Sequence, residues 1–200
     1  MAFADPKENI KNLDLKEGSI VVDLGAGSGF YSMEIAKRVG DKGVVYAVDV
    51  NKESLVHLAS KAKDAGLDNI DVIWADADEI GGTQLKDSFV DVVVLSNVLF
   101  QSENKENMIK EAGRILKSGG EALVIDWDTA LPGIGPRPPQ VITLDKAEEM
   151  FRGGVDILTT GKMLALFAFS IPTESMIHLL ARAFYAMKDT LTPVLMSVVG

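Results

Sequence analysis

The stretch VVDLGAGSGF, residues 21–30, decides the fold of this 200-residue chain. A short apolar run ends at Asp23, and glycines follow at alternate positions, Gly25, Gly27 and Gly29, before a helical pattern begins. Because glycine has no Cβ and tolerates positive φ, such a turn lets a ligand lie against the backbone. A helix that opens after the turn offers free N–H groups and a partial positive charge. The stretch therefore predicts a strand, a turn and a helix that bind the polar end of a nucleotide-like cofactor.

Strand-like and helix-like segments alternate along the chain outward from this turn. Apolar runs predict strands at 20–24, 43–50, 69–75, 89–96 and 121–127. Helical periodicity predicts helices at 31–39, 52–65, 103–117 and 144–151. Strands that are regularly separated by helices predict an α/β fold, a Rossmann-like doubly wound parallel sheet with helices on both faces.

The composition excludes several classes of protein. The net charge of the chain is −9, and its acidic excess resides in residues 1–150, which argues against nucleic-acid binding, because that needs clustered Lys and Arg. There is no cysteine, so disulfides and thiolate metal sites are excluded, and the spacing of the aspartates predicts no metal site. The N-terminus lacks the apolar core of a signal peptide, so we expect a cytoplasmic main domain.

Ligands of such sheets bind outside the carboxyl ends of the strands, so the residues that follow each strand are the candidates. Asp49 ends the second strand about 20 residues beyond Gly29, a spacing that suits a carboxylate bound to both ribose hydroxyls. Asp76 follows the third strand, where it could accept a hydrogen bond from an adenine amino group. Asn97, after the fourth strand, fits a substrate contact or a turn cap equally well. We interpret Asp126, at the end of the fifth strand, as a hydrogen-bond anchor rather than a general base.

Five segments in order carry a family resemblance: VVDLGAGSGFYS, VYAVDV, WADADEI, DVVVLSNVLFQ and ILKSGGEALVIDW. They resemble the successive motifs of class I S-adenosylmethionine-dependent methyltransferases, in particular the small-molecule group typified by the ubiquinone/menaquinone-biosynthesis enzymes. The resemblance implies a sheet of order 3-2-1-4-5 extended by two further strands as 3-2-1-4-5-7-6. It also implies transfer of a methyl group from S-adenosyl-L-methionine to a small-molecule acceptor.

The resemblance assigns a set of cofactor-binding residues. They are Asp23, Gly25, Ala26, Gly27, Gly29, Asp49, Val50, Asp76, Ala77, Ser96 and Asn97. Within this set, Asp23 and Gly25 are expected to hold the methionine end of the cofactor, while Gly27 and Gly29 allow close approach of the backbone.

The nucleoside end falls to the later strands. Asp49 is expected to bind the ribose hydroxyls and Val50 to pack on the adenine. Asp76 faces the adenine amino group, and Ala77 supplies a backbone donor. Residues 96–97 border the methyl group and the substrate.

The sequence departs from related patterns at two places. Phe30 stands where the nicotinamide fingerprint G-x-G-x-x-G has its third glycine, which disfavours nicotinamide-dependent redox chemistry. In many methyltransferases of this kind a histidine follows the asparagine of the fourth strand, whereas this chain has Phe100 and Gln101. The catalytic residue is therefore left unassigned. No N-P-P-[YF] motif follows the fourth strand, which disfavours methylation of DNA bases.

The tail, residues 152–200, does not continue the alternation. It is apolar and helical in pattern, and Pro172 interrupts it. Its uncharged run, Met163–Thr173, is shorter than the roughly 18–20 residues of a membrane span. The tail resembles an internal fragment of MurJ-type lipid II flippases, most strongly at residues 180–194. We therefore expect a methyltransferase domain at 1–151 and a hydrophobic helical segment at 152–200. That segment is either a membrane anchor or the product of a fused or mis-joined reading frame.

Two alternatives to a methyltransferase with an appended tail stay open. The chain could be a truncated or fused protein that binds the cofactor without turnover and carries a flippase-like membrane segment. It could also be a fragment of a membrane transporter. The sequence predicts no oligomeric state.

Overall fold

A computed structural model describes residues 5–127, 130, 135–143, 146–147 and 149–150, together with the backbone of 163–168. The chain divides into two compact units, one formed by Pro6–Phe167 and the other by Met1–Asp5 with Ala168–Gly200. The first unit contains the sheet up to Phe167 in its last strand, the helices and the candidate site, and it is the unit described below.

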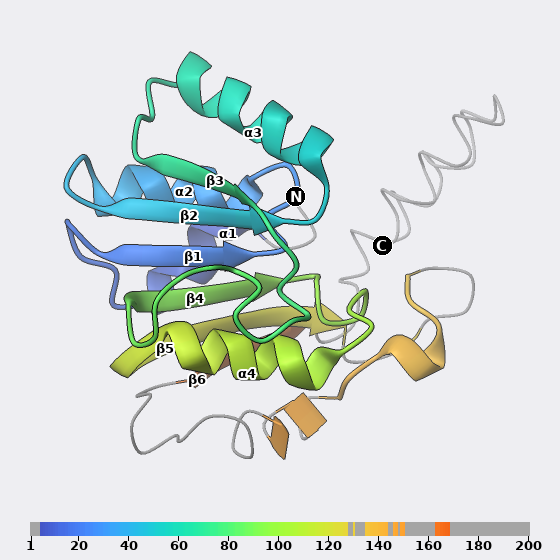
Figure 1. Ribbon diagram of the computed structural model, residues 1–200. Coiled ribbons are helices and arrows are strands. Elements are labelled where there is room, and N and C mark those ends of the chain that lie inside the picture. Colours follow the sequence, from blue (N-terminus) through green and yellow to red (C-terminus); the bar gives the residue numbers. More distant parts are fainter. Residues whose placement is uncertain are drawn as a thin grey trace, which may run out of the picture. The chain divides into compact units, whose positions relative to one another are not determined.

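Within the described part of the chain, six strands form one sheet (Figure 1). They are β1 (Ile20–Leu24), β2 (Val44–Asp49), β3 (Ile70–Trp74), β4 (Val90–Ser96), β5 (Leu116–Trp127) and β6 (Met163–Ala168). Their spatial order is β3-β2-β1-β4-β5-β6, and each neighbouring pair from β3 to β5 is parallel. The predicted parallel order 3-2-1-4-5 is confirmed.

The register brings the carboxyl ends of the strands to one edge of the sheet. Leu24 of β1 lies opposite Val48 of β2 and Leu95 of β4, and Val48 lies opposite Ile73 of β3. The turns that leave these strands therefore start side by side, which is the arrangement that places a ligand site at this edge.

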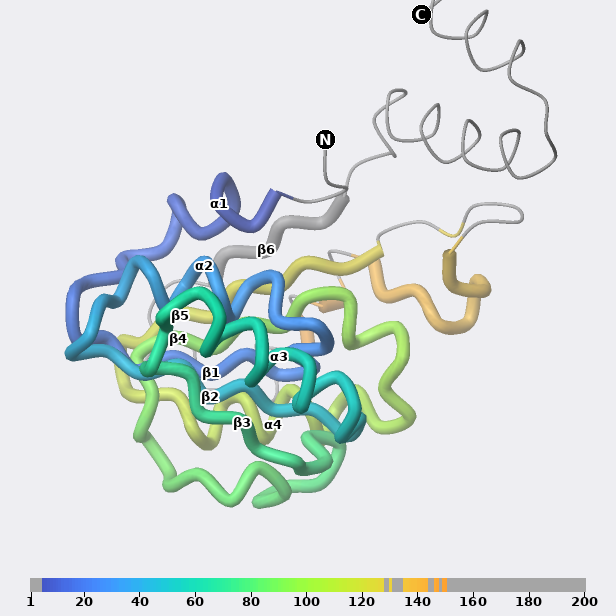
Figure 2. The backbone as a smooth tube through the Cα atoms, turned by 90° about the horizontal axis from the view of Figure 1, so that it is seen from above, coloured from blue at the N-terminus to red at the C-terminus, as the bar shows by residue number. Residues whose placement is uncertain are grey.

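Helices cover both faces of the sheet (Figures 1 and 2). They are α1 (Pro6–Asn9), α2 (Phe30–Val39), α3 (Lys52–Asp64) and α4 (Lys105–Ile115), with short 3-10 turns at Ile10–Asn12 and Pro138–Gln140. Helices α2 and α3 pack on one face, and α4 packs on the other. Both α3 and α4 begin at an asparagine whose side chain accepts a backbone hydrogen bond, Asn51 from Ser54 and Asn104 from Asn107.

The alternation of side chains along the strands divides the core between the two faces. Val22 and Leu95 pack with Ile109 of α4 in the larger cluster. Ala47 of β2 packs with Leu58 of α3 in the smaller cluster. The sheet is thus buried on both sides, as its nearly continuous apolar runs predict.

The structure corrects two expectations about the later elements. The residues Ser118-Gly119-Gly120, expected to end a helix, lie inside β5, which begins at Leu116 and has a register irregularity opposite Val90/Val92. The six residues Met163–Ala168, expected to be helical, form β6 at the sheet edge beside β5. A short apolar run has no polar positions to reveal its period, so periodicity alone does not distinguish strand from helix there. The rest of the predicted helical tail lies outside the described residues.

Candidate functional site

A pocket of about 410 Å³ opens at the carboxyl edge of the sheet. It is formed where the chain leaves β1, β2, β3 and β4, with one contribution from α4. Its lining residues are Gly25, Gly27, Val48, Asp49, Val50, Asn51, Ser54, Ala75, Asp76, Ala77, Asp78, Val98, Gln101, Ser102 and Met108.

The glycine turn forms one wall of the pocket and is fixed to β2. The backbone N–H groups of Gly25 and Ala26 both donate to the carbonyl of Val48, at 2.9 and 3.0 Å. Gly25 has a φ of +74°, and a Cβ placed there would collide with the side chain of Val98. Gly27 has a φ of +52°, and a Cβ there would meet nothing within 4 Å. The turn therefore needs glycine for its path at Gly25, and at Gly27 it leaves open space in the pocket.

Asp49 stands against this turn at the end of β2. Its Oδ2 accepts a hydrogen bond from the N–H of Gly27 at 2.7 Å, and its Oδ1 accepts one from the N–H of Asn51 at 2.7 Å. An ionised carboxylate has about four acceptor positions. About two positions therefore remain for a ligand, which matches the two donors of a vicinal diol.

The loop after β3 provides an acidic wall. Asp76 is exposed, Ala77 is buried, and the Oδ1 of Asp76 accepts the N–H of Asp78 at 2.8 Å. Val50, next to Asp49, is 61% exposed, and its carbonyl accepts the indole N–H of Trp74 at 2.9 Å. An exposed apolar side chain thus lines the pocket next to Asp49 in the sequence.

The charges of the lining have one sign. Asp49, Asp76 and Asp78 all line the pocket, and none of the described residues in its lining is basic. Such a pocket favours a cationic ligand over one that carries phosphate groups.

The structure brings together six of the eleven residues that the sequence assigned to the cofactor. They are Gly25, Gly27, Asp49, Val50, Asp76 and Ala77. The other five, Asp23, Ala26, Gly29, Ser96 and Asn97, do not belong to the pocket lining.

Asp23 lies beneath the glycine turn. It is 2% exposed, and its Oδ2 accepts hydrogen bonds from the N–H and the hydroxyl of Ser32, at 3.1 and 2.6 Å. Burial raises the pKa of Asp23 to about 6, although the bonds from Ser32 oppose the rise. In this structure Asp23 therefore ties the end of β1 to the first turn of α2.

Gly29 and Ala26 face the helices rather than the pocket. A Cβ at Gly29, whose φ is +79°, would collide with Leu58 of α3. Ala26 is buried and belongs to the same core cluster as Leu58. The lack of a side chain at Gly29 therefore allows α3 to pack closely on the turn.

The residues after β4 form a tight turn. Asn97 has a φ of +53°, its N–H donates to the carbonyl of Ile125 at 2.7 Å, and its amide donates to Ser96 Oγ at 3.3 Å. Left-handed backbone is a conformation that asparagine tolerates, and it fits the turn-cap interpretation.

Asp126 holds the next part of the same loop. It is 3% exposed, and its carboxylate accepts the N–H of Trp127 at 2.7 Å and that of Phe100 at 3.3 Å. Burial raises its pKa, and the backbone hydrogen bonds oppose that rise. These hydrogen bonds fit the interpretation of Asp126 as an anchor of the loop.

Nine lining residues were not among the sequence assignments. They are Val48, Asn51, Ser54, Ala75, Asp78, Val98, Gln101, Ser102 and Met108. Some had a readable signal, because Asn51 is a helix cap directly after Asp49, and Asp78 follows Asp76 in the same loop. Met108 had none, since its place on α4 gives no hint that α4 reaches the pocket.

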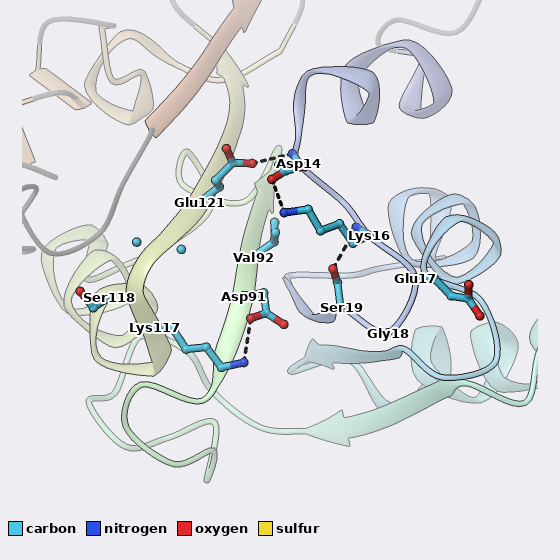
Figure 3. A pocket seen from close by; sticks show the side chains of 12 residues that line it. Asp14, Lys16, Glu17, Gly18, Ser19, Asp91, Val92, Lys117, Ser118 and Glu121 are labelled. Carbon is cyan, nitrogen blue, oxygen red and sulfur yellow. Dashed lines mark hydrogen bonds and ion pairs between the residues drawn. The ribbon is translucent and has the colours of Figure 1, made fainter.

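A second hollow, of about 380 Å³, lies at the opposite, amino-terminal edge of the strands (Figure 3). Most of its charged groups pair with one another, and Glu17 pairs with Lys42 outside the hollow. Lys16 pairs with Asp14, and Lys117 pairs with Asp91, both at 2.7 Å, while Glu121 accepts the N–H of Asp14 at 2.8 Å. This hollow therefore has the features of a surface ion-pair network rather than of a ligand site.

No cluster of three or more side chains able to hold a metal ion occurs among the described residues. Every helix in this part of the chain is too short or too polar to span a bilayer.

The fold and the pocket define the class of Rossmann-like domains that bind a nucleoside cofactor at the carboxyl edge of a parallel sheet. The sequence profile of the family described as "Methyltransferase domain" matches residues 15–164. The chain therefore belongs to the methyltransferase domain family. This confirms the resemblance to class I S-adenosylmethionine-dependent methyltransferases, a class of transferases whose cofactor is S-adenosyl-L-methionine.

Three relatives illustrate the similarity. A solved S-adenosylmethionine-dependent methyltransferase from Aquifex aeolicus is 30% identical, with a TM-score of 0.66, over 75% of this chain and 78% of that one. Arsenite methyltransferase of Aquipseudomonas alcaligenes is 34% identical over 56% of this chain and 34% of its own length. The ubiquinone/menaquinone biosynthesis C-methyltransferase of Vibrio vulnificus is 30% identical over 56% of this chain and 42% of its own length. The chain thus spans less than half of the two curated relatives.

The tail has a match of its own. The profile described as "Lipid II flippase MurJ" matches residues 152–200, and it overlaps the methyltransferase match at 152–164. The overlap includes the first residues of β6.

Proposed function

We propose that this chain is a methyltransferase that binds S-adenosyl-L-methionine in the carboxyl-edge pocket and methylates a small-molecule acceptor. The observation that carries the proposal is the hydrogen bond from the N–H of Gly27 to the carboxylate of Asp49, at 2.7 Å. The described residues that line the pocket include three aspartates and no basic residue. Family membership supports the same class of reaction.

The residues of the pocket fit the cofactor. Asp49 retains acceptor positions for the ribose hydroxyls, and the bare face of Gly27 leaves room beside them. Val50 offers an apolar surface to the adenine, and Asp76 and the backbone of Ala77 offer an acceptor and a donor for its edge. When bound, the cofactor supplies an electrophilic methyl group on a positively charged sulfur. The chain contributes position and electrostatics to the transfer.

The charge of the pocket distinguishes this cofactor from a nicotinamide dinucleotide. Three carboxylates in a lining that includes no described basic residue attract a sulfonium nucleoside and repel a pyrophosphate. This supports the sequence argument from Phe30 against nicotinamide-dependent redox chemistry.

We propose an organic acceptor for the methyl group. The relatives include an arsenite methyltransferase and a quinone C-methyltransferase. Trivalent arsenic is soft and favours thiolate ligands, and this chain supplies no cysteine. The absence of thiols favours a quinol, phenol or amine over arsenite.

Calorimetric titration of the full chain with S-adenosylhomocysteine tests cofactor binding. We expect micromolar affinity, and Asp49→Ala should weaken it about 100-fold, because two hydrogen bonds to a charged acceptor are lost. Asp71→Ala, which removes an exposed carboxylate of β3 outside the pocket, is the matched control and should leave the affinity unchanged. Equal affinities of the Asp49→Ala variant and the unmodified chain would refute the assignment of the ribose site.

Turnover separates the methyltransferase from a protein that only binds the cofactor. The full chain is incubated with S-adenosylmethionine and a panel of quinols, phenols and amines, and methylated product is measured by mass spectrometry. Product from any acceptor supports the enzyme. Intact cofactor binding with no product across the panel favours the inactive alternative.

We also propose a cytoplasmic methyltransferase domain at 1–151 and membrane association through 152–200, supported by the methyltransferase match of the former and the MurJ match of the latter. Fractionation of cells that express the full chain tests this. Recovery with the membranes after a high-salt wash supports it, and recovery in the supernatant contradicts it.

A further inference from the structure

The segment between β3 and β4, residues 75–89, contains turns but no helix or strand. Its first part, Ala75–Asp78, forms the acidic wall of the pocket. Long connections without regular structure are uncommon and are often functional. The contacts that hold this loop therefore determine where its carboxylates lie.

The first contact is made by Asp78. Its Oδ1 accepts the hydroxyl of Ser102 at 2.7 Å, and its Oδ2 accepts the N–H groups of Glu103 and Asn104, at 2.8 and 3.1 Å. These three residues lead into α4, so the start of the loop is fastened to the approach to that helix.

The second contact is made by Glu111, in the middle of α4. Its side chain is fully buried, at 0% exposure. One carboxylate oxygen accepts the N–H of Gly81 at 2.7 Å, and the other accepts the N–H of Thr83 at 3.2 Å together with the hydroxyl of Thr83. A buried carboxylate is costly unless it is paired and hydrogen-bonded, and here three donors come from the loop.

Arg114 completes the network. Its guanidinium donates to Glu111 at 2.8 and 2.7 Å, and it also donates to the carbonyl of Leu85 at 2.8 Å and to Asp87 at 2.5 Å. Burial would raise the pKa of Glu111, but the bonds from Arg114, Thr83 and Gly81 outweigh it, so the pKa lies below its usual range. The carboxylate is therefore ionised at neutral pH.

The turn that Glu111 holds lies directly against Asp76. A Cβ on Gly82 would collide with the backbone carbonyl of Asp76. Gly81 and Thr83 flank Gly82, so a displacement of this turn also displaces the backbone of Asp76. Glu111 thus acts on a pocket residue although it does not line the pocket.

We propose that Glu111 is a positioning residue for the cofactor: through Gly81 and Thr83 it sets the place of Asp76 and Ala77, and so the recognition of the adenine amino group. The inference rests on the proposed function, because it concerns the same pocket. It assigns α4 a role in cofactor selectivity in addition to its packing on the sheet.

The test compares two ligands by calorimetry on the full chain. S-adenosylhomocysteine carries the adenine amino group, and S-inosylhomocysteine carries an oxygen in its place. The unmodified chain should prefer the adenosyl ligand. Glu111→Gln replaces an acceptor oxygen by an amino group that faces the N–H donors of Gly81 or Thr83. It should lower the affinity for the adenosyl ligand about tenfold, which is the effect of one misplaced hydrogen bond. Binding of the inosyl ligand should change less than about threefold, so the ratio of affinities falls.

Two further variants separate positioning from general destabilisation. Asp91→Asn removes a carboxylate that accepts the N–H of Ile20 and pairs with Lys117 at the opposite edge of the sheet. It should lower the melting temperature but preserve the ratio of affinities. If Glu111→Gln does not fold, Thr83→Val is tested with the same two titrations. It removes one hydrogen-bond donor to Glu111, and it should lower the ratio of affinities by a smaller factor.

The outcomes are distinct. A preserved ratio in a folded Glu111→Gln variant, or in Thr83→Val when the former does not fold, would overturn the inference and leave the proposed function intact. Failure of the unmodified chain to bind S-adenosylhomocysteine would overturn the proposed function, and the inference with it.

Discussion

Two aspartates of neighbouring strands show that the same type of side chain has different roles at different positions. Asp49 is partly exposed at the pocket and retains acceptor positions for a ligand. Asp23 is buried under the glycine turn, and Ser32 supplies its two hydrogen bonds. The first is available for recognition, whereas the second stabilises the junction of β1 and α2.

Asp23 gives a prediction about pH. Its folded-state pKa of about 6 lies above the ordinary value of 3.8, so the folded protein holds the proton more tightly than the unfolded chain does. The resulting stabilisation is complete below pH 3.8 and is lost as the pH rises through 6. The difference between a pKa of 3.8 and one of about 6 corresponds to about 3 kcal/mol. Asp23→Asn keeps an acceptor for Ser32 without titrating.

Urea unfolding at pH 4 and pH 7 measures this effect. Relative to Asp23→Asn, the unmodified chain should lose up to about 3 kcal/mol of unfolding free energy between the two pH values. Parallel stability curves for the two proteins would show that Asp23 does not titrate as described.

The sequence predicted the residues whose roles depend on local spacing. Gly25, Gly27 and Asp49 follow directly from the strand ends, and the structure brings them together. The burial of Asp23 and the packing of Gly29 on α3 depend on helices that are distant in sequence. Motif spacing carries no information about such contacts, and the cofactor roles of these two residues remain predictions.

Among the secondary-structure elements, β5 supports the loop that follows β4. Its penultimate residue, Asp126, accepts the N–H groups of Phe100 and Trp127. The same loop contributes Gln101 and Ser102 to the pocket. The end of β5 therefore holds the loop after β4, which forms part of the pocket wall.

Asp126→Ala tests this anchor. It leaves two backbone donors without their acceptor, and we expect the free energy of unfolding to fall by about 1–3 kcal/mol. Asp126→Asn retains one acceptor and should lose less. Chemical denaturation with Asp71→Ala as the surface control measures both. Unchanged stability of Asp126→Ala would argue against the anchor and revive the general-base interpretation.

The elements that sequence patterns predicted least well are those at the β5 side of the sheet. Glycines 119 and 120 are ordinary signals of a helix end, yet they lie within β5 beside a register irregularity. A Cβ on Gly120 would lie 2.8 Å from the carbonyl of Asp91, so close strand packing accounts for a glycine there. Such a requirement arises from the neighbouring strand and is not visible in the local pattern.

At the scale of the chain, the compact unit Pro6–Phe167 extends beyond the domain predicted at 1–151. The strand β6 occupies the sheet edge beside β5, where the family resemblance implies further strands. A covered edge strand is less prone to pairing with other chains. The boundary at residue 151 remains a prediction, and the overlap of the two family matches at 152–164 lies across the same region.

The most direct test of the cofactor site is a titration of the isotope-labelled full chain with S-adenosylhomocysteine, followed by backbone amide chemical shifts. We predict shifts at Gly27, Asp49 and Ala77 in the carboxyl-edge pocket. The amides of Gly18 and Gly119, in the hollow of Figure 3, should not move. Shifts confined to Gly18 and Gly119, or no shifts at saturating ligand, would contradict the account.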